Sequence, residues 1–293
     1  MVAVQWYPGH MEKARREMSD HLKAVDMVIE LRDARIPKSS RNPMLDQMAQ
    51  GKPKLILLSK ADLADPQETE KWLNCLGTQP DQKAMAIDLQ HDQSYRQKIV
   101  SACLQLTEAR RARMIRKGIH PRPMRAMVCG VPNAGKSTLI NRIAGKNQVR
   151  TADKPGVTRK LVWIKADRNL EILDTPGVLW PKFSDPKTGS LLAATGAVNE
   201  DILNLEEIAM DTIHTIRSRY PGVLEAEYGA DESTRTDVML DQIAAARRLV
   251  IEGEQPDRKR AAGVFLHEMR RGRLGRFTLE SPDENEINPS VSE

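Results

Sequence analysis

The sequence predicts an α/β protein with a mostly parallel sheet, followed by a smaller all-helical region. Short apolar segments rich in β-branched residues alternate with amphipathic helical segments along most of the chain, a pattern typical of parallel strands joined by helices. Beyond about residue 200 the strand pattern stops and the apolar periodicity becomes helical. A chain of 293 residues is long enough for two ordinary domains.

The expected elements follow from composition and periodicity. The segment 54–58 is apolar after its first lysine, as expected for a parallel strand covered on both faces. The expected strands are 25–31, 54–58, 83–87, 126–129, 161–164 and 170–173. The expected helices are 12–22, 66–76, 92–117 and 136–144, and then 206–220, 238–252 and 258–271 in the helical region.

Composition excludes several classes of protein. The net charge of +5 and isoelectric point near 9.1 fit a nucleic-acid partner without requiring one. No apolar run approaches the roughly 20 residues of a membrane-spanning helix. Residues 1–10 lack the basic start and apolar stretch of a signal peptide. We therefore expect a cytoplasmic protein with no membrane insertion.

A glycine-rich loop stands between an expected strand and an expected helix. Residues 130–137 read Gly-Val-Pro-Asn-Ala-Gly-Lys-Ser, a spacing that lets backbone N–H groups surround phosphate oxygens at a helix N-terminus. Lys136 is expected to reach the β- and γ-phosphates, and the Ser137 hydroxyl to bind Mg²⁺. The predicted phosphate-binding residues are Asn133, Ala134, Gly135, Lys136, Ser137 and Thr138.

A second phosphate-facing motif, Asp174-Thr175-Pro176-Gly177, directly follows an expected strand. The Asp174 carboxylate is expected to hold Mg²⁺, commonly through a water, and the Gly177 N–H to sense the γ-phosphate. Between the two motifs, the loop 154–159 contains Thr158 after a flexible Pro-Gly. Thr158 is a better candidate than Thr151 for the threonine that closes on Mg²⁺ and the γ-phosphate, and a plain surface threonine is the alternative.

The motif Ser59-Lys60-Ala61-Asp62 ends the strand 54–58 and has the form of a base-reading loop. An aspartate in this position accepts hydrogen bonds from guanine N1–H and the 2-amino group, which adenine cannot offer, so GTP and GDP are favoured over ATP. Ser59 replaces the usual Asn or Thr and reaches less far, which is expected to lower affinity and not specificity. A companion loop is expected near 86–88. An incidental Ser-Lys pair before a helix is the alternative.

The order of these motifs is unusual. In an ordinary GTPase the base-reading motif comes after the phosphate motifs, whereas here it comes before them. A circular permutation explains this order without changing the sheet, because the chain ends move to another loop while the strands keep their places. The segment after Gly177 then leads directly into the helical region.

With this order, the chain closely resembles the circularly permuted GTPases of the ribosome biogenesis GTPase A family, which assist late maturation of the bacterial large ribosomal subunit. The resemblance covers nearly the whole chain and departs at Ser59, where the family usually has Asn. It implies a GTP hydrolase that binds GTP or GDP and Mg²⁺, with K⁺ as a further candidate ligand. The matching segments are 6–11, 31–37, 41–43, the phosphate loop, 155–158, 174–182 and 272–277.

The resemblance also implies roles for individual residues. Val178 occupies the position of the water-orienting glutamine of Ras-like enzymes, and the family gives that role to the residue matched by His10. On the sequence alone, a histidine at the start of a helix is more often a cap or a phosphate contact. Asn133 matches the asparagine of potassium-stimulated GTPases, with an ordinary turn residue as the alternative. The expected catalytic groups are His10, Lys136 and Thr158, and the expected metal ligands are Ser137, Thr158 and Asp174.

Two stretches concentrate positive charge. Arginine forks suit phosphate oxygens, and release of RNA counterions makes such binding salt-dependent. A solvated helix face is the alternative for each stretch, and we favour RNA for the second because it lies in the helical region. The first stretch holds Arg110, Arg111, Arg113, Arg116, Lys117, Arg122 and Arg125, and the second holds Arg258, Lys259, Arg260, Arg270, Arg271, Arg273 and Arg276.

These observations predict three regions: a circularly permuted GTPase domain with an N-terminal helical extension over 1–185, a helical RNA-binding domain over 186–280, and a disordered acidic tail over 281–293. The expected partners are ribosomal RNA and the large-subunit precursor, not DNA, and we expect a monomer when free. The predicted function is GTP hydrolysis that times a late step of ribosome assembly. The alternative is a regulatory GTPase whose helical domain binds a protein.

Overall fold

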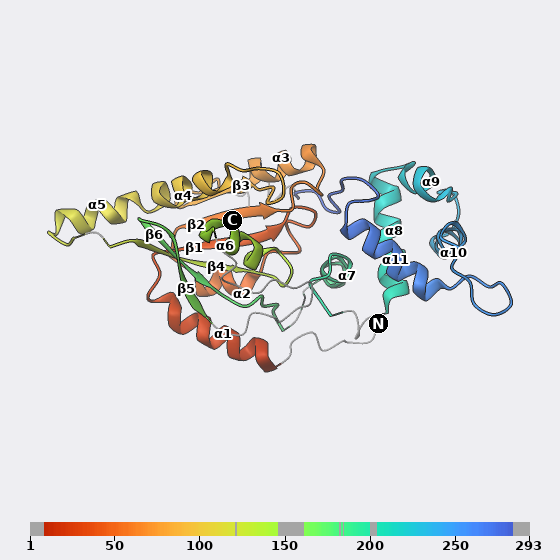
Figure 1. Cartoon of the computed structure of the whole chain (residues 1–293), viewed down its shortest axis with the longest axis horizontal. Helices are drawn as coiled ribbons and strands as arrows, with labels where there is room; N and C mark the ends of the chain where they lie inside the picture. The colour runs from red at the N-terminus through yellow and green to blue at the C-terminus, as the bar shows by residue number, and fades with distance from the viewer. Residues whose placement is uncertain are drawn as a thin grey trace.

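The computed structural model of the protein describes residues 9–120, 122–145, 161–181, 183, 185–199 and 204–283. Within these residues, one six-stranded sheet with its covering helices is joined to a group of helices at one end (Figure 1). Five strands are parallel and β5 runs antiparallel to β6. The expected α/β class with a mostly parallel sheet is therefore confirmed.

All the strands expected from the sequence are present, in the spatial order β3-β2-β1-β4-β6-β5. Strand β4, which precedes the glycine-rich loop, pairs with β1 on one side and β6 on the other. The carboxyl ends of these parallel strands therefore meet at one edge of the sheet. The strands are β1 Met27–Asp33, β2 Lys54–Ser59, β3 Gln82–Ala86, β4 Met124–Gly130, β5 Val162–Asp167 and β6 Leu170–Asp174.

Alternation along each strand divides the core into two faces. Ile29 and Leu55 belong to a cluster that includes residues of α4 and α6. Val28 belongs to a second cluster, with residues of α1 and α2. Strands β1 and β2 are almost fully buried, as parallel strands covered on both faces should be. The helices of this part are α1 Gly9–Leu22, α2 Pro43–Met48, α3 Pro66–Cys75, α4 Tyr95–Leu106, α5 Glu108–Arg116 and α6 Lys136–Ala144.

The remaining helices form a bundle in which α8 packs against α7, α10 and α11. Inside it, the Glu268 carboxylate accepts the Tyr228 hydroxyl at 2.8 Å and the Arg247 guanidinium at 3.0 Å. Burial alone would raise the pKa of Glu268, but these bonds outweigh it and hold the pKa below its usual value. The bundle helices are α7 Pro186–Ala194, α8 Leu205–Arg219, α9 Val223–Tyr228, α10 Thr236–Ala246 and α11 Arg258–Arg270.

Two expected helices differ from the structure. The segment 92–117 forms α4 and α5, divided at Thr107, whose buried hydroxyl donates to the Cys103 carbonyl at 2.7 Å. The segment 238–252 ends as a helix at Ala246, because Arg248 adopts a left-handed φ of 54° and the Leu249 N–H turns back to Ala244. Side chains that close a turn locally compete with helix continuation.

Three short helices, α2, α7 and α9, were not expected. For α2 and α7 a signal was present, since Asn42-Pro43 and Asp185-Pro186 each place an N-cap residue before proline at the first helical position. Helices α2, α7 and α9 are too short to show the apolar periodicity from which the longer helices were predicted.

The chain after α11 returns from the bundle to the sheet. The Leu279 N–H donates to the Arg35 carbonyl at 2.8 Å, and the Trp72 indole donates to the Glu280 carbonyl at 3.1 Å. The Glu280 carboxylate accepts both the N–H and the hydroxyl of Ser39 at 2.8 Å. Of the expected tail, residues 281–283 are described, and residues 284–293 lie outside the described residues.

Among the described residues, no helix combines the length and the apolar character needed to cross a bilayer.

Candidate functional site

The glycine-rich loop leaves β4 at the carboxyl edge of the sheet and ends at α6 (Figure 1). A Cβ at Gly130 would lie 2.4 Å from the Leu31 carbonyl oxygen, so only glycine fits beside β1. Gly135 has a φ of 89° and forms the N-cap of α6. Asn133 also adopts a left-handed φ, of 58°. The loop therefore has the tightly curved backbone that the phosphate-binding interpretation requires.

Lys136 begins α6 with its side chain folded back over this loop. It is only 6% exposed, and its ammonium donates to the Val131 carbonyl at 2.7 Å and the Gly130 carbonyl at 3.1 Å. Burial lowers the pKa of Lys136 to about 8, although the negative charge of Asp174 acts in the opposite direction. The loop thus encloses a desolvated positive charge.

Asp174 ends β6 and is buried beside Lys136. Burial raises the pKa of its carboxyl to about 6, against the attraction of Lys136. Its Oδ1 atom is buried and has no hydrogen-bond partner among the described residues. A buried acceptor without a partner is costly and rare, which indicates that this atom serves something other than the fold.

Gly177 lies against the glycine-rich loop. An added Cβ there would be 2.7 Å from the Pro132 Cα and 2.9 Å from the Lys136 Nζ. The next residue, Val178, is fully buried in the core. Its carbonyl accepts the Asn42 side-chain amide at 3.0 Å, while Asn42 also caps α2. The backbone that follows Asp174 is therefore held on both sides.

The segment 59–62, which was expected to read the base, contacts the glycine-rich loop directly. The Ser59 hydroxyl lies 2.7 Å from the Ala134 carbonyl and 3.0 Å from the Arg32 carbonyl, and it is fully buried. Serine is long enough to make this contact, and its expected effect on guanine affinity stays a prediction. The two motifs, separated along the chain, are thus joined by one hydroxyl.

Lys60 adopts a left-handed φ of 58° and binds the carboxylate of Asp33 at 2.9 Å. Asp33 also accepts two bonds from the Arg35 guanidinium, at 2.9 and 2.7 Å. Burial alone would raise the pKa of Asp33, but Arg35 and Lys60 outweigh it and hold the pKa far below its usual range. Sequence reasoning missed Asp33 and Arg35 as parts of the site, although Asp33 was signalled by its place at the end of an apolar strand.

Asp62 is half-buried, and burial raises its pKa, with a further increase from the negative charge of Asp88. Ligand atoms of Asp62, Asp88 and His91 lie within 4.8 Å of one another. The Ala61 N–H donates to the Ile87 carbonyl. The expected companion loop at 86–88 therefore lies beside the motif that it was expected to support.

The remaining expected residues divide into three groups. Ser137 and Thr138 lie in the first turn of α6. His10 lies in the first turn of α1, and its side chain is outside the described part of the chain. Thr158, Thr151 and the loop around them also lie outside the described residues.

Three arginines of the second basic stretch are engaged within the protein. Arg270 donates to the Ala193 and Ala194 carbonyls at 2.7 Å, Arg258 makes two 2.6 Å bonds to Asp241, and Arg276 binds backbone carbonyls of the base-reading loop. These bonds engage three of the seven cations that were expected to bind RNA, whereas Lys259, Arg260 and Arg273 are exposed, and RNA binding by this stretch stays a prediction. The first stretch differs, because α5 has no buried residue.

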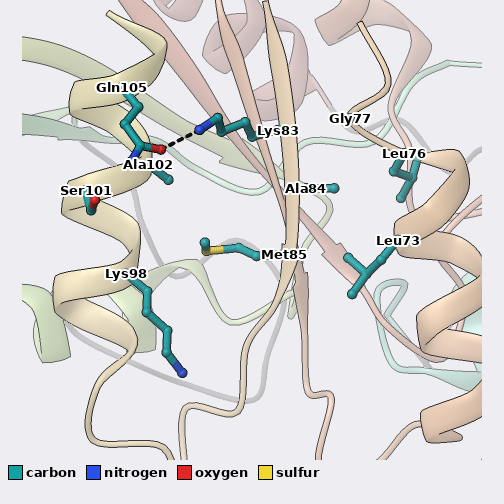
Figure 2. A pocket seen from close by; sticks show the side chains of 10 residues that line it. All are labelled: Leu73, Leu76, Gly77, Lys83, Ala84, Met85, Lys98, Ser101, Ala102 and Gln105. Carbon is teal, nitrogen blue, oxygen red and sulfur yellow. Dashed lines mark hydrogen bonds between the residues drawn. The ribbon is translucent and has the colours of Figure 1, made fainter. Parts of the chain in front are cut away.

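A groove of about 480 Å³ lies between α3, β3 and α4, and Figure 2 shows its side chains. None of its lining residues belongs to the motifs described above. They are Leu73, Leu76, Gly77, Lys83, Ala84, Met85, Lys98, Ser101, Ala102 and Gln105.

A strand leading to a glycine-rich loop and helix, with an aspartate at the end of the neighbouring strand, defines a P-loop nucleotide-binding protein. Strands β1 and β2 lie in the same sheet on one side of β4, and the motif expected to read the base follows β2, so it precedes the P-loop in the chain and the P-loop fold is circularly permuted. The family model described as "50S ribosome-binding GTPase" matches residues 125–246. Relatives named "Ribosome biogenesis GTPase A" are 43% and 45% identical over 97% of this chain, so the chain belongs to that family, and it is a GTP hydrolase that binds guanine nucleotides.

Curated relatives and solved structures support this assignment. "Ribosome biogenesis GTPase A" of Priestia megaterium is 45% identical over 97% of this chain and 99% of the relative. The protein of the same name from Bacillus cereus is 43% identical over 97% and 95%. A GDP-bound structure of TM YlqF has a TM-score of 0.66 at 25% identity, covering 91% of this chain and 99% of that one. GNP-bound YlqF from T. maritima has a TM-score of 0.62 at 25% identity, covering 92% and 99%.

The close approach of Gly177 to the P-loop leads to a first prediction. Gly177→Ala is expected to weaken guanine-nucleotide binding by about tenfold or more, because the added methyl group displaces Pro132 and Lys136. Titration with a fluorescent GDP analogue measures this. Gly263→Ala in α11 is the matched control, since its Cβ meets no atom within 4 Å among the described residues. Equal affinities for the two variants would contradict the close packing.

Proposed function

We propose that this protein binds the precursor of the large ribosomal subunit in its GTP-bound form and leaves it after hydrolysis, timing a late step of assembly. One observation carries the proposal: the P-loop and the helical bundle share α7. The Asn133 side chain donates to the Gly196 carbonyl at 2.6 Å, just after α7, and Arg270 of α11 binds the last carbonyls of the same helix. A movement of the P-loop on GTP hydrolysis would therefore act on the Asn133–Gly196 hydrogen bond, and through α7 on the bundle.

The roles of the phosphate-site residues are part of this proposal. Lys136 binds the β- and γ-phosphates, and the Gly177 N–H contacts the γ-phosphate. The partnerless Oδ1 of Asp174 fits a ligand role toward Mg²⁺, together with Ser137 and with Thr158. Bound Mg²⁺ supplies charge neutralisation between the phosphates. Asn133 is the candidate K⁺ ligand, so we expect hydrolysis to be faster in K⁺ than in Na⁺.

We assign the recognition of guanine to Asp62, with Ser59 and Lys60 as its supports. Asp62→Asn is expected to shift preference from guanosine toward xanthosine nucleotides, because the amide can donate to the O2 that xanthine carries in place of the 2-amino group. Competition of GDP and XDP for the protein measures the shift. Asp81→Asn, at an exposed aspartate, is the control. If Asp62→Asn keeps its guanine preference, the assignment of residues 59–62 is wrong.

We assign the orientation of the attacking water to His10. Val178 cannot do this, because it is apolar and fully buried. His10→Ala is expected to leave nucleotide affinity within a few-fold and to slow hydrolysis by about a hundredfold, the usual contribution of a positioned acid or base. His21→Ala, at the other end of α1, is the control. Turnover of His10→Ala at the normal rate in the presence of ribosomal particles would remove His10 from the mechanism.

For the ribosomal RNA we assign contact to α5, which projects from the sheet at the end opposite the bundle (Figure 1). Asp26 pairs with Arg110 and Arg122, and Glu171 pairs with Arg125. The rest of the stretch has no ion pair among the described residues: Arg111 is half-buried, and Arg113, Arg116 and Lys117 are exposed. Such unpaired cations on a projecting helix suit a phosphate backbone.

Replacing Arg111, Arg113 and Arg116 by glutamine tests this assignment. We expect weaker sedimentation with large-subunit precursors in the presence of a non-hydrolysable GTP analogue, and a log–log salt slope lowered by about one unit for each lost phosphate contact. GTP affinity should stay unchanged. The matched variant replaces Arg248, Lys259 and Arg260 of the bundle, which are also exposed. If only that variant weakens association, the bundle contacts the RNA. Association that requires GTP but is insensitive to salt would favour a protein partner.

We also expect the free protein to be a monomer in the cytoplasm. Sedimentation equilibrium with and without nucleotide tests the monomeric state.

A further inference from the structure

The chain that follows α11 runs along the loop that carries Asp62. Two atoms of the Arg276 guanidinium bind this loop, since Nε donates to the Ala64 carbonyl at 2.9 Å and Nη2 to the Ala61 carbonyl at 2.8 Å. These carbonyls lie on either side of Asp62 in the sequence. The planar, rigid fork of arginine fixes the spacing between two acceptors in a way that a single ammonium cannot.

The fit between the two segments is close. The Phe277 N–H donates to the Leu63 carbonyl at 3.0 Å. A Cβ at Gly272, which has a left-handed φ of 72°, would lie 2.7 Å from the Leu63 side chain. The carbonyls of residues 61, 63 and 64 are therefore all bound by residues 276 and 277.

The supporting segment is itself firmly held. Arg219 of α8 donates to the Thr278 carbonyl at 2.9 Å, and the Tyr220 and Phe277 rings meet edge to face at 5.2 Å. On the other side, the Leu279 N–H binds the Arg35 carbonyl. Because residues 276–279 are held at several points, they can keep the loop 61–64 in one conformation, whereas a mobile segment would move together with the loop.

We propose that Arg276 is a positioning residue for guanine recognition, which acts by fixing the backbone turn that carries Asp62. This inference rests on the proposed role of Asp62 in reading the base. Asp62 must present two carboxylate oxygens to two adjacent donors of guanine, so a small rotation of the turn weakens both bonds. Lys60, with its left-handed φ, begins the same turn, and its carbonyl accepts the Leu63 N–H at 2.9 Å.

Arg276 can be replaced without disturbing the core, because its side chain is exposed. Arg276→Ala is expected to weaken GDP binding about three- to tenfold, a range that corresponds to the loss of one or two hydrogen bonds of ordinary net strength. Inosine lacks the 2-amino group, so IDP makes only one of the two bonds to Asp62. IDP affinity should therefore fall less, and the preference for GDP over IDP should narrow.

The experiment measures GDP and IDP affinities of the full-length chain by isothermal titration calorimetry, for the unmodified protein, Arg276→Ala, Arg276→Lys and Arg273→Ala. Arg273 lies in the same segment and is exposed, so Arg273→Ala should retain both affinities. Arg276→Lys keeps the charge without the fork, so it should recover only part of the preference.

An equal fall in GDP and IDP affinity, or no fall, in Arg276→Ala would overturn the positioning role, since a merely destabilised protein loses both ligands alike. The proposed role of Asp62 is tested separately. If the unmodified protein has no preference for GDP over IDP, and Asp62→Asn leaves guanine binding intact, the assignment of Asp62 itself fails.

Discussion

The buried ammonium of Lys136 is the constraint around which the nucleotide site is organised. A cation taken out of water is costly unless acceptors surround it. Here the acceptors are the carbonyls of Gly130 and Val131, with the Asp174 carboxylate nearby. Glycine is required at position 177 partly for this reason, because a Cβ there would lie 2.9 Å from the Lys136 Nζ.

Burial in this arrangement shifts the pKa of both Lys136 and Asp174 toward neutrality. The pKa of Lys136 is lowered by burial and that of Asp174 is raised by it, so both groups are less strongly ionised than they would be in water. Phosphate oxygens would compensate the ammonium of Lys136 more fully than the two loop carbonyls do, and a divalent cation would compensate the carboxylate of Asp174. Incompletely compensated charges of this kind are expected at sites where a ligand supplies the missing partners.

Much of the fold and of the site could be predicted from the sequence because both depend on local patterns. The apolar strands, the Gly-Lys-Ser loop opening a helix and the Asp174 motif each lie within a few consecutive residues. What could not be predicted depends on backbone carbonyls as partners, which have no sequence signature. Arg270 and Arg276 looked like RNA-binding cations, yet they bind carbonyls of residues 193, 194, 61 and 64. The division of α4 from α5 at Thr107 is another case, since a hydroxyl that binds its own helix resembles any other threonine.

The position of the segment from Arg276 to Glu280 in the chain affects how the protein folds during its synthesis. Arg276 is added to the chain 215 positions after its hydrogen-bond partner Ala61. Glu280, whose carbonyl accepts the Trp72 indole N–H, is added 208 positions after Trp72. While the chain is still emerging from the ribosome, the sheet strands and the P-loop can form, but the loop after β2 lacks the residues that complete its hydrogen bonds. The turn at residues 61–64 therefore gains these hydrogen bonds only after Arg276 and Phe277 have been synthesised, and until then its backbone is less restrained.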